Sequence, residues 1–108
     1  MDIEAIRNYA IQKPAVTEGL PFGEGTLVFK VNNKIFLLLA LDAVPLQFNV
    51  KCDPEKALEL REEYPDLVLP GYHMNKKHWN TVIVNGKLSS KLILQMMDES
   101  YKLVKGLK

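Results

Sequence analysis

Apolar residues at helical spacing predict three helices, each bounded by residues that favour helix ends. The first begins after Asp2, a suitable N-cap, and stops close to the proline at position 14. The second has the strongest signature, because Asp53 is followed by Pro54, which fits the first helical position. The third begins at Ser89 or Ser90 and ends near the glycine at position 106. The apolar faces of these helices consist of Ile3, Ile6 and Ala10, of Ala57, Leu60 and Tyr64, and of Leu92, Ile93, Met96, Met97 and Val104.

Apolar runs between the first two helices predict an antiparallel meander of three strands. Residues 26–31 (TLVFKV) and 34–41 (KIFLLLAL) are strand-like. Asn32 and Asn33 separate them, and this pair tolerates the left-handed backbone of a tight hairpin turn. Residues 45–50 (PLQFNV) form the third strand. Its inward positions are Leu46, Phe48 and Val50.

Further strand patterns follow the second helix. Residues 80–84 (NTVIV) predict a strand that ends in an Asn85-Gly86 turn, and residues 67–69 are a second, shorter candidate. The expected order is α-β-β-β-α-β-β-α, which indicates an α+β fold with an antiparallel sheet packed on helices. We expect residues 1–108 to form a single domain.

Composition restricts the class of protein. The 108 residues are 47% apolar and 25% charged, which is typical of a globular domain with one core. The longest apolar run starts at Ile35 and is broken at Asp42, whereas a membrane-spanning helix needs about 20 apolar residues. The first ten residues lack a secretory signal pattern. A single cysteine, Cys52, cannot form an internal disulfide, which agrees with a reducing compartment. From these observations together we expect a cytoplasmic protein with no membrane partner.

Charge is distributed unevenly although the formal net charge is only +1. No acidic residue lies between Asp66 and Asp98. Residues 53–66, by contrast, hold six acidic side chains against Lys56 and Arg61. The sequence therefore predicts a dipolar protein, with an acidic second helix and a basic segment after it. The basic and histidine residues of that segment are His73, Lys76, Lys77, His78, Lys87 and Lys91.

The twelve residues GYHMNKKHWNTV, starting at position 71, are the most distinctive candidate site. Lys76 and Lys77 beside Asn75 suit contacts with phosphates, while Trp79 or Tyr72 offers a ring for stacking on an unpaired base. The competing interpretation is a solvated turn that leads into a strand, with the tryptophan and one histidine packed inward as core or sheet-edge anchors. In either case the turn presents the asparagine and the two lysines outward.

Metal-binding and catalytic motifs are not recognisable. His73 and His78 are five positions apart and Cys52 is distant, which matches no dense ligand pattern, so we expect neither a metal nor another cofactor. Cys52 precedes a helix N-terminus that could lower its pKa, although a small buried cysteine is the favoured interpretation. We find no Ser-His-Asp arrangement, no HExxH and no phosphate-binding loop, and we expect a protein that is not an enzyme.

The stretches that carry a family resemblance are LQFNVKCDPEKALELREEYPDLVLPGYHMNKKHWNTVIVNGKL and MMDESYKLV. Through them the chain resembles the MmcQ/YjbR family, small bacterial proteins usually described as predicted DNA-binding proteins. The resemblance covers essentially the whole chain and is most specific at positions 70–82. It implies a two-layer α/β sandwich with an antiparallel sheet, similar to type III secretion chaperones. It also implies DNA binding.

Two functional hypotheses follow. The first is a DNA-binding protein that contacts mainly the phosphate backbone through residues 75–91, with little sequence specificity. The second is a non-enzymatic protein-interaction module, in which the sheet or the acidic helix binds a polypeptide, or in which the basic segment pairs with that helix in a homodimer. The residues of the first hypothesis are His73, Asn75, Lys76, Lys77, His78, Trp79, Lys87 and Lys91.

Overall fold

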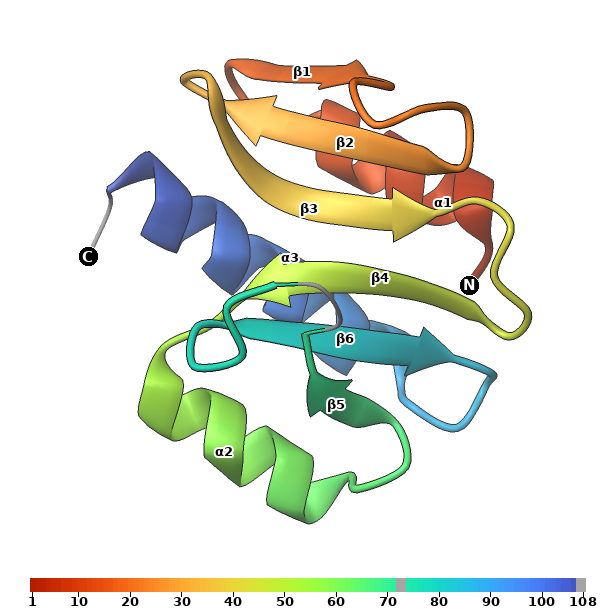
Figure 1. The fold of residues 1–108 in the computed structure, drawn as a ribbon, viewed down its shortest axis with the longest axis vertical. Coiled ribbons are helices and arrows are strands. Elements are labelled where there is room, and N and C mark those ends of the chain that lie inside the picture. The colour runs from red at the N-terminus through yellow and green to blue at the C-terminus, as the bar shows by residue number, and fades with distance from the viewer. Residues whose placement is uncertain (72–73, 107–108) are drawn as a thin grey trace.

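The computed structural model describes residues 1–71 and 74–106, and within these residues the elements follow the order α-β-β-β-β-α-β-β-α (Figure 1). Every expected helix and strand is present, which confirms the α+β fold. The elements are α1 (Ile3–Ile11), β1 (Val16–Gly19), β2 (Thr26–Val31), β3 (Lys34–Ala40), β4 (Leu46–Lys51), α2 (Pro54–Glu63), β5 (Val68–Pro70), β6 (Trp79–Val84) and α3 (Ser90–Lys105).

The strands form one sheet in the order β1-β2-β3-β4-β6-β5, and all neighbours are antiparallel. The expected meander is the β2-β3-β4 part of this sheet. Asn32 and Asn33 turn the chain between β2 and β3 with φ angles of 52° and 66°. Both residues therefore adopt the left-handed conformation that a two-residue hairpin loop requires.

The expected element order is incomplete by one strand, β1. Val16 pairs with Val31 and Gly19 pairs with Val28, so β1 forms the edge of the sheet beside β2. Four residues with a single apolar side chain carry too little alternation to be recognised as a strand from their sequence. The ladder with β2 supplies the hydrogen bonds that fix them.

The helix ends follow the capping residues. The side chain of Asp2 accepts a hydrogen bond from the backbone N–H of Ala5 at 2.8 Å, and Asp53 does the same for α2. Ser89 caps α3, which ends at Gly106 in the left-handed conformation. The sequence prediction of these helix ends is confirmed.

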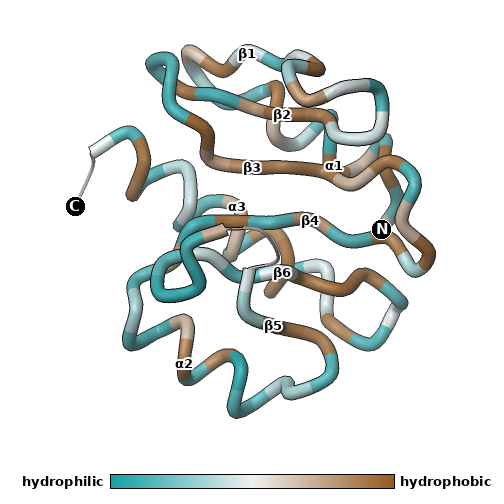
Figure 2. Tube along the Cα trace, in the orientation of Figure 1, coloured by the Kyte–Doolittle hydropathy of each residue, from teal (hydrophilic) through white to brown (hydrophobic). Residues whose placement is uncertain are grey.

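The main core lies between the sheet and the helices. The cross-strand row Phe29–Leu37–Val50 is buried in it, as are Ile6 of α1 and Met97 of α3. Figure 1 shows α1 and α3 behind the sheet. Figure 2 shows β2 and β3 as largely hydrophobic strands and α2, beyond the other end of the sheet, as a mostly hydrophilic helix.

The opposite surface of the sheet, which we call the open face, is the one turned away from α1 and α3. Because side chains alternate along a strand, the neighbouring row Val28–Leu38–Asn49–Thr81 points to this side. No helix in the described residues covers the open face in Figure 1. None of the described helices is long and apolar enough to cross a membrane.

Candidate nucleic-acid interface

Residues 74–78, which we call the 74–78 turn, precede β6 and are organised by Asn75. Its carbonyl oxygen accepts hydrogen bonds from the N–H groups of His78 at 3.1 Å and Trp79 at 3.0 Å. Its side-chain oxygen accepts a third from the N–H of Lys77 at 3.0 Å. The backbone is therefore fixed locally, and the side chains of Lys76 and Lys77 are exposed, as predicted.

Arg61 of α2 anchors this turn to the acidic helix. Its Nε donates to Oδ1 of Asn80 at 2.7 Å, and its Nη2 donates to the carbonyl oxygens of Trp79, at 3.1 Å, and of Lys76. Asn80 is only 1% exposed. From the sequence alone, Arg61 is only a charge that offsets its acidic neighbours. The one signal for its role is that it is the sole arginine of that acidic helix.

Two further contacts hold the turn against the sheet. Gly71 donates from its N–H to the carbonyl oxygen of Trp79 at 2.9 Å, and Cys52 donates from its N–H to the carbonyl oxygen of His78 at 2.7 Å. A Cβ on Gly71 would lie 2.8 Å from Cβ of Trp79, so this close approach requires glycine. The 74–78 turn is thus fixed by contacts from β5, α2 and the end of β4.

Trp79 lies on the open face and not in the main core. It pairs with Lys51 in the β4–β6 ladder, and cross-strand partners share a face of the sheet. Its neighbour along the strand, Asn80, points the other way, in line with Val50. Trp79 is partly exposed and is not a residue of the main core. The expectation that it packs into the core is therefore wrong. The open face holds a partly exposed indole ring beside the lysine of β4 and next to the 74–78 turn.

The four lysines of the predicted site form two separate groups. Lys76 and Lys77 precede β6, whereas Lys87 follows β6 and Lys91 lies in the first turn of α3. The six residues of β6, about 20 Å of extended chain, separate the segments that carry these two groups. All four side chains are exposed, and none forms an ion pair with another described residue.

The histidines do not form a metal site in the described part of the chain. His78 is partly buried in the 74–78 turn, and His73, like Tyr72, lies outside the described residues. Within residues 1–71 and 74–106, no three side chains of His, Cys, Asp or Glu form a group suited to a metal ion.

Cys52 is a buried thiol and not an activated one. Burial, together with the carboxylate of Glu99, raises the pKa of Cys52 from its ordinary value of 9.0 to about 11. The alternative that the N-terminus of α2 lowers this pKa is wrong, because removal from water opposes the thiolate more strongly than the helix end favours it.

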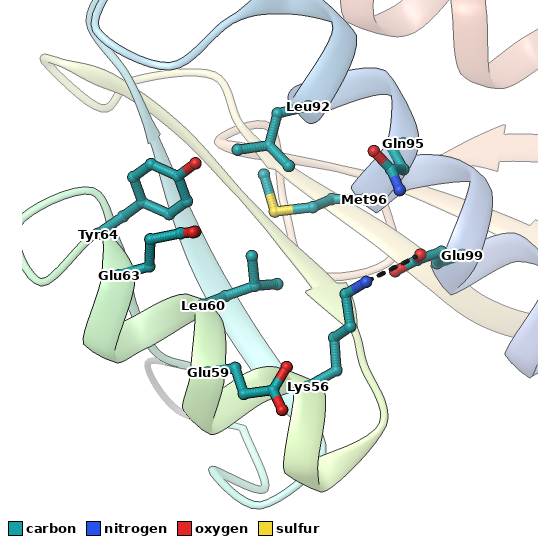
Figure 3. Close-up of a pocket in the computed structure, with 9 residues that line it drawn as sticks. All are labelled: Lys56, Glu59, Leu60, Glu63, Tyr64, Leu92, Gln95, Met96 and Glu99. Carbon is teal, nitrogen blue, oxygen red and sulfur yellow. Dashed lines mark ion pairs between the residues drawn. The ribbon is translucent and has the colours of Figure 1, made fainter.

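A groove between α2 and α3 is the second candidate surface (Figure 3). It has a volume of about 340 Å³. Leu60, Leu92 and Met96 line it with apolar atoms, and Glu59 and Glu63 stand at its α2 side without an ion pair among the described residues. Across the groove, Lys56 of α2 is 3.6 Å from a carboxylate oxygen of Glu99 of α3. The groove is acidic, unlike the surface around the 74–78 turn.

Sequence comparison identifies bacterial proteins that are similar to this chain. The family model named YjbR matches residues 11–103. The uncharacterized protein YbdF of Escherichia coli is 40% identical, in a match that covers 94% of this chain and 82% of YbdF. The uncharacterized protein YjbR of Escherichia coli is 29% identical, over 94% of this chain and 86% of its own length.

Solved structures of similar proteins share the fold. The crystal structure of Deinococcus radiodurans protein DR2400 matches with a TM-score of 0.91 and 37% identity, covering 98% of this chain and 81% of that one. A crystal structure of a Pseudomonas syringae protein matches with a TM-score of 0.79 and 28% identity, covering 96% and 99% of the two chains. Since the family match spans the whole sheet, α2 and the 74–78 turn, this chain belongs to the YjbR family.

Proposed function

We propose that this protein binds nucleic acid through the open face of its sheet, with phosphates held by Lys51, Lys76 and Lys77 around Trp79. The observation that carries this proposal is the pairing of Lys51 with Trp79 beside the 74–78 turn. It places the lysine of β4 on the same face of the sheet as one partly exposed aromatic ring, and the turn that carries two more lysines leads directly into that ring's strand. Lysines supply point charges for phosphates, and an aromatic ring supplies a stacking surface for a base.

The fixed backbone of the turn supports this role. Arg61, Gly71 and Cys52 hold the main chain around Lys76 and Lys77, so binding needs to order only the two side chains. The three lysines lie at the end of a strand and in a turn, and not on a helix that could enter a major groove. We therefore infer contacts mainly with the backbone and a binding role that involves no catalysis.

The division of the lysines reduces the expected number of main contacts. Lys87 and Lys91 lie at the far end of β6, and we assign them no main role in binding. Three neutralised phosphates correspond to a slope of about 2.7 in the fall of log K with log salt for duplex DNA, and of about 2.1 for a single strand.

Fluorescence anisotropy of labelled DNA over a series of salt concentrations tests the proposal. We expect binding that weakens with a slope between about 2 and 3. A slope near zero would mean that phosphates are not the ligand. An absence of binding at about 50 mM salt would overturn the proposal outright.

The groove between α2 and α3 favours a second candidate function, the binding of a basic polypeptide segment. Glu59 and Glu63 leave two carboxylates beside an apolar floor, which suits a segment that carries both cationic and apolar side chains. A second copy of the chain could supply such a segment in the form of its basic turn. Sedimentation of the protein at rising concentration, with Glu59→Gln/Glu63→Gln as the comparison, tests the homodimer. We expect self-association that the double variant abolishes.

A further inference from the structure

A hollow on the open face lies next to the lysines of the proposed interface. It has a volume of about 420 Å³, within the range of small-molecule sites. The strands β2, β3 and β4 form its floor, and two loops contribute Phe22 on one side and Met74 on the other. The residues used in the argument below are Phe22, Leu38, Ala40, Gln47, Asn49 and Met74.

The walls of the hollow are suited to the flat faces of a base. Phe22 is 66% exposed, although a phenylalanine that served only the core would be buried. Met74 contributes a polarizable thioether, which makes favourable contacts with aromatic rings. Leu38 and Ala40 complete an apolar surface between them. Stacking on such side chains is tolerant of sequence, because every base has two such faces.

The floor of the hollow also offers hydrogen-bonding groups. The side-chain amide of Gln47 has no hydrogen-bond partner among the described residues. The side-chain oxygen of Asn49 accepts a hydrogen bond from Oγ1 of Thr81 at 2.5 Å, and no other described residue accepts a hydrogen bond from the NH₂ group of Asn49. Amide side chains of this kind form hydrogen bonds with the polar edges of bases.

The hollow and Lys51 lie on the same face of the sheet. Asn49 and Lys51 are two residues apart in β4 and therefore share the open face, about 7 Å from each other along the strand. Met74 belongs to the same turn as Lys76. A phosphate held by these lysines would thus belong to a nucleotide chain that passes the mouth of the hollow.

We propose that the hollow between Phe22 and Met74 accepts one unpaired nucleobase of a single strand whose phosphates lie on Lys51, Lys76 and Lys77. This inference rests on the proposed function and deepens it. In a duplex the bases are stacked and paired, so a duplex must first be opened before a base can enter the hollow. The protein should therefore prefer single strands to duplex at equal numbers of phosphates.

The test compares three labelled probes of about ten nucleotides: oligodeoxythymidylate, an abasic oligomer of the same length, and a duplex. The full chain is compared with Phe22→Ala and Gln47→Ala, and Leu103→Ala serves as the control. Leu103 is 43% exposed on α3, in the helical layer of the fold, so its truncation removes exposed apolar surface elsewhere. Circular dichroism confirms that each variant is folded.

We expect Phe22→Ala to weaken binding of oligodeoxythymidylate at least about fivefold and to leave binding of the abasic oligomer unchanged. The control Leu103→Ala should bind every probe as the wild-type protein does. Gln47→Ala should weaken it in the same selective way. If the abasic oligomer binds as tightly as oligodeoxythymidylate and Phe22→Ala has no effect, the base site is wrong while the phosphate surface stands. If no probe binds at low salt, both are overturned.

Discussion

Arg61 Nε lies 2.7 Å from Oδ1 of Asn80, and this contact joins the acidic helix α2 to strand β6. The same guanidinium group donates to two carbonyl oxygens of the chain that enters β6, those of Lys76 and Trp79. The side chain of Arg61 therefore links the acidic helix α2 to the basic segment that follows it. The position of the lysine turn depends on a residue of the helix with opposite charge.

Replacing Arg61 by alanine should destabilise the protein by about 2–3 kcal/mol. The substitution removes the donor to the buried Oδ1 of Asn80 and to the carbonyl oxygen of Lys76, and one of the two donors to the carbonyl oxygen of Trp79. Urea unfolding, followed by the fluorescence of the single tryptophan, measures the loss. Arg7→Ala is the matched control, because Arg7 pairs with Glu18 at 2.5 Å in an exposed salt bridge, which contributes little. Equal losses in the two variants would contradict the anchoring role of Arg61.

Gly71→Ala should also disturb the interface. The new Cβ would lie 2.8 Å from Cβ of Trp79 and 3.0 Å from its carbonyl oxygen, so the strand or the turn must move. We expect a loss of about 1–3 kcal/mol and a shift in tryptophan emission. Gly19→Ala provides the comparison, since its Cβ would be 4.0 Å from the nearest atom, Cδ of Pro21. A Gly71→Ala protein as stable as the Gly19→Ala protein would show that the close approach is not required.

The buried thiol of Cys52 makes stability depend on pH in the alkaline range. Because folding raises the pKa of Cys52 from 9.0 to about 11, its contribution is complete below about pH 9 and is lost as pH rises through 11. Between about pH 8 and pH 10.5, the wild-type protein should lose about 2 kcal/mol more than Cys52→Ala. Urea unfolding at the two pH values gives this difference. Identical pH dependence of the two proteins would contradict the burial of the thiol.

The sequence predicted local features reliably and misjudged features that depend on strand pairing. The caps Asp2, Asp53 and Ser89 and the Asn32-Asn33 hairpin act within a few residues, so their residue types determine them. Strand β1, by contrast, exists because β2 lies beside it.

The candidate site was predicted only in part, because its exposed turn is a local feature whereas the arrangement of its residues depends on strand pairing. Lys76 and Lys77 are exposed in a turn, as expected, but their distance from Lys87 and Lys91 follows from the extended chain of β6 between them. The face on which Trp79 lies depends on its register with β4. Lys51 and Phe22 are distant from the basic segment in sequence, and the fold brings their surfaces to the same side of the sheet.

The central claim, that nucleic acid is bound at the 74–78 turn, is tested most directly by two double variants with the same change in charge. Lys76→Ala/Lys77→Ala removes the lysines of the turn, and Lys87→Ala/Lys91→Ala removes the pair at the other end of β6. Affinity for a single-stranded oligonucleotide is measured for both over a series of salt concentrations that starts at about 50 mM. We predict that the first variant loses most of its affinity and about 1.4 units of salt slope, while the second stays close to the wild-type protein. Equal losses in both variants, or no loss in either, would contradict the account.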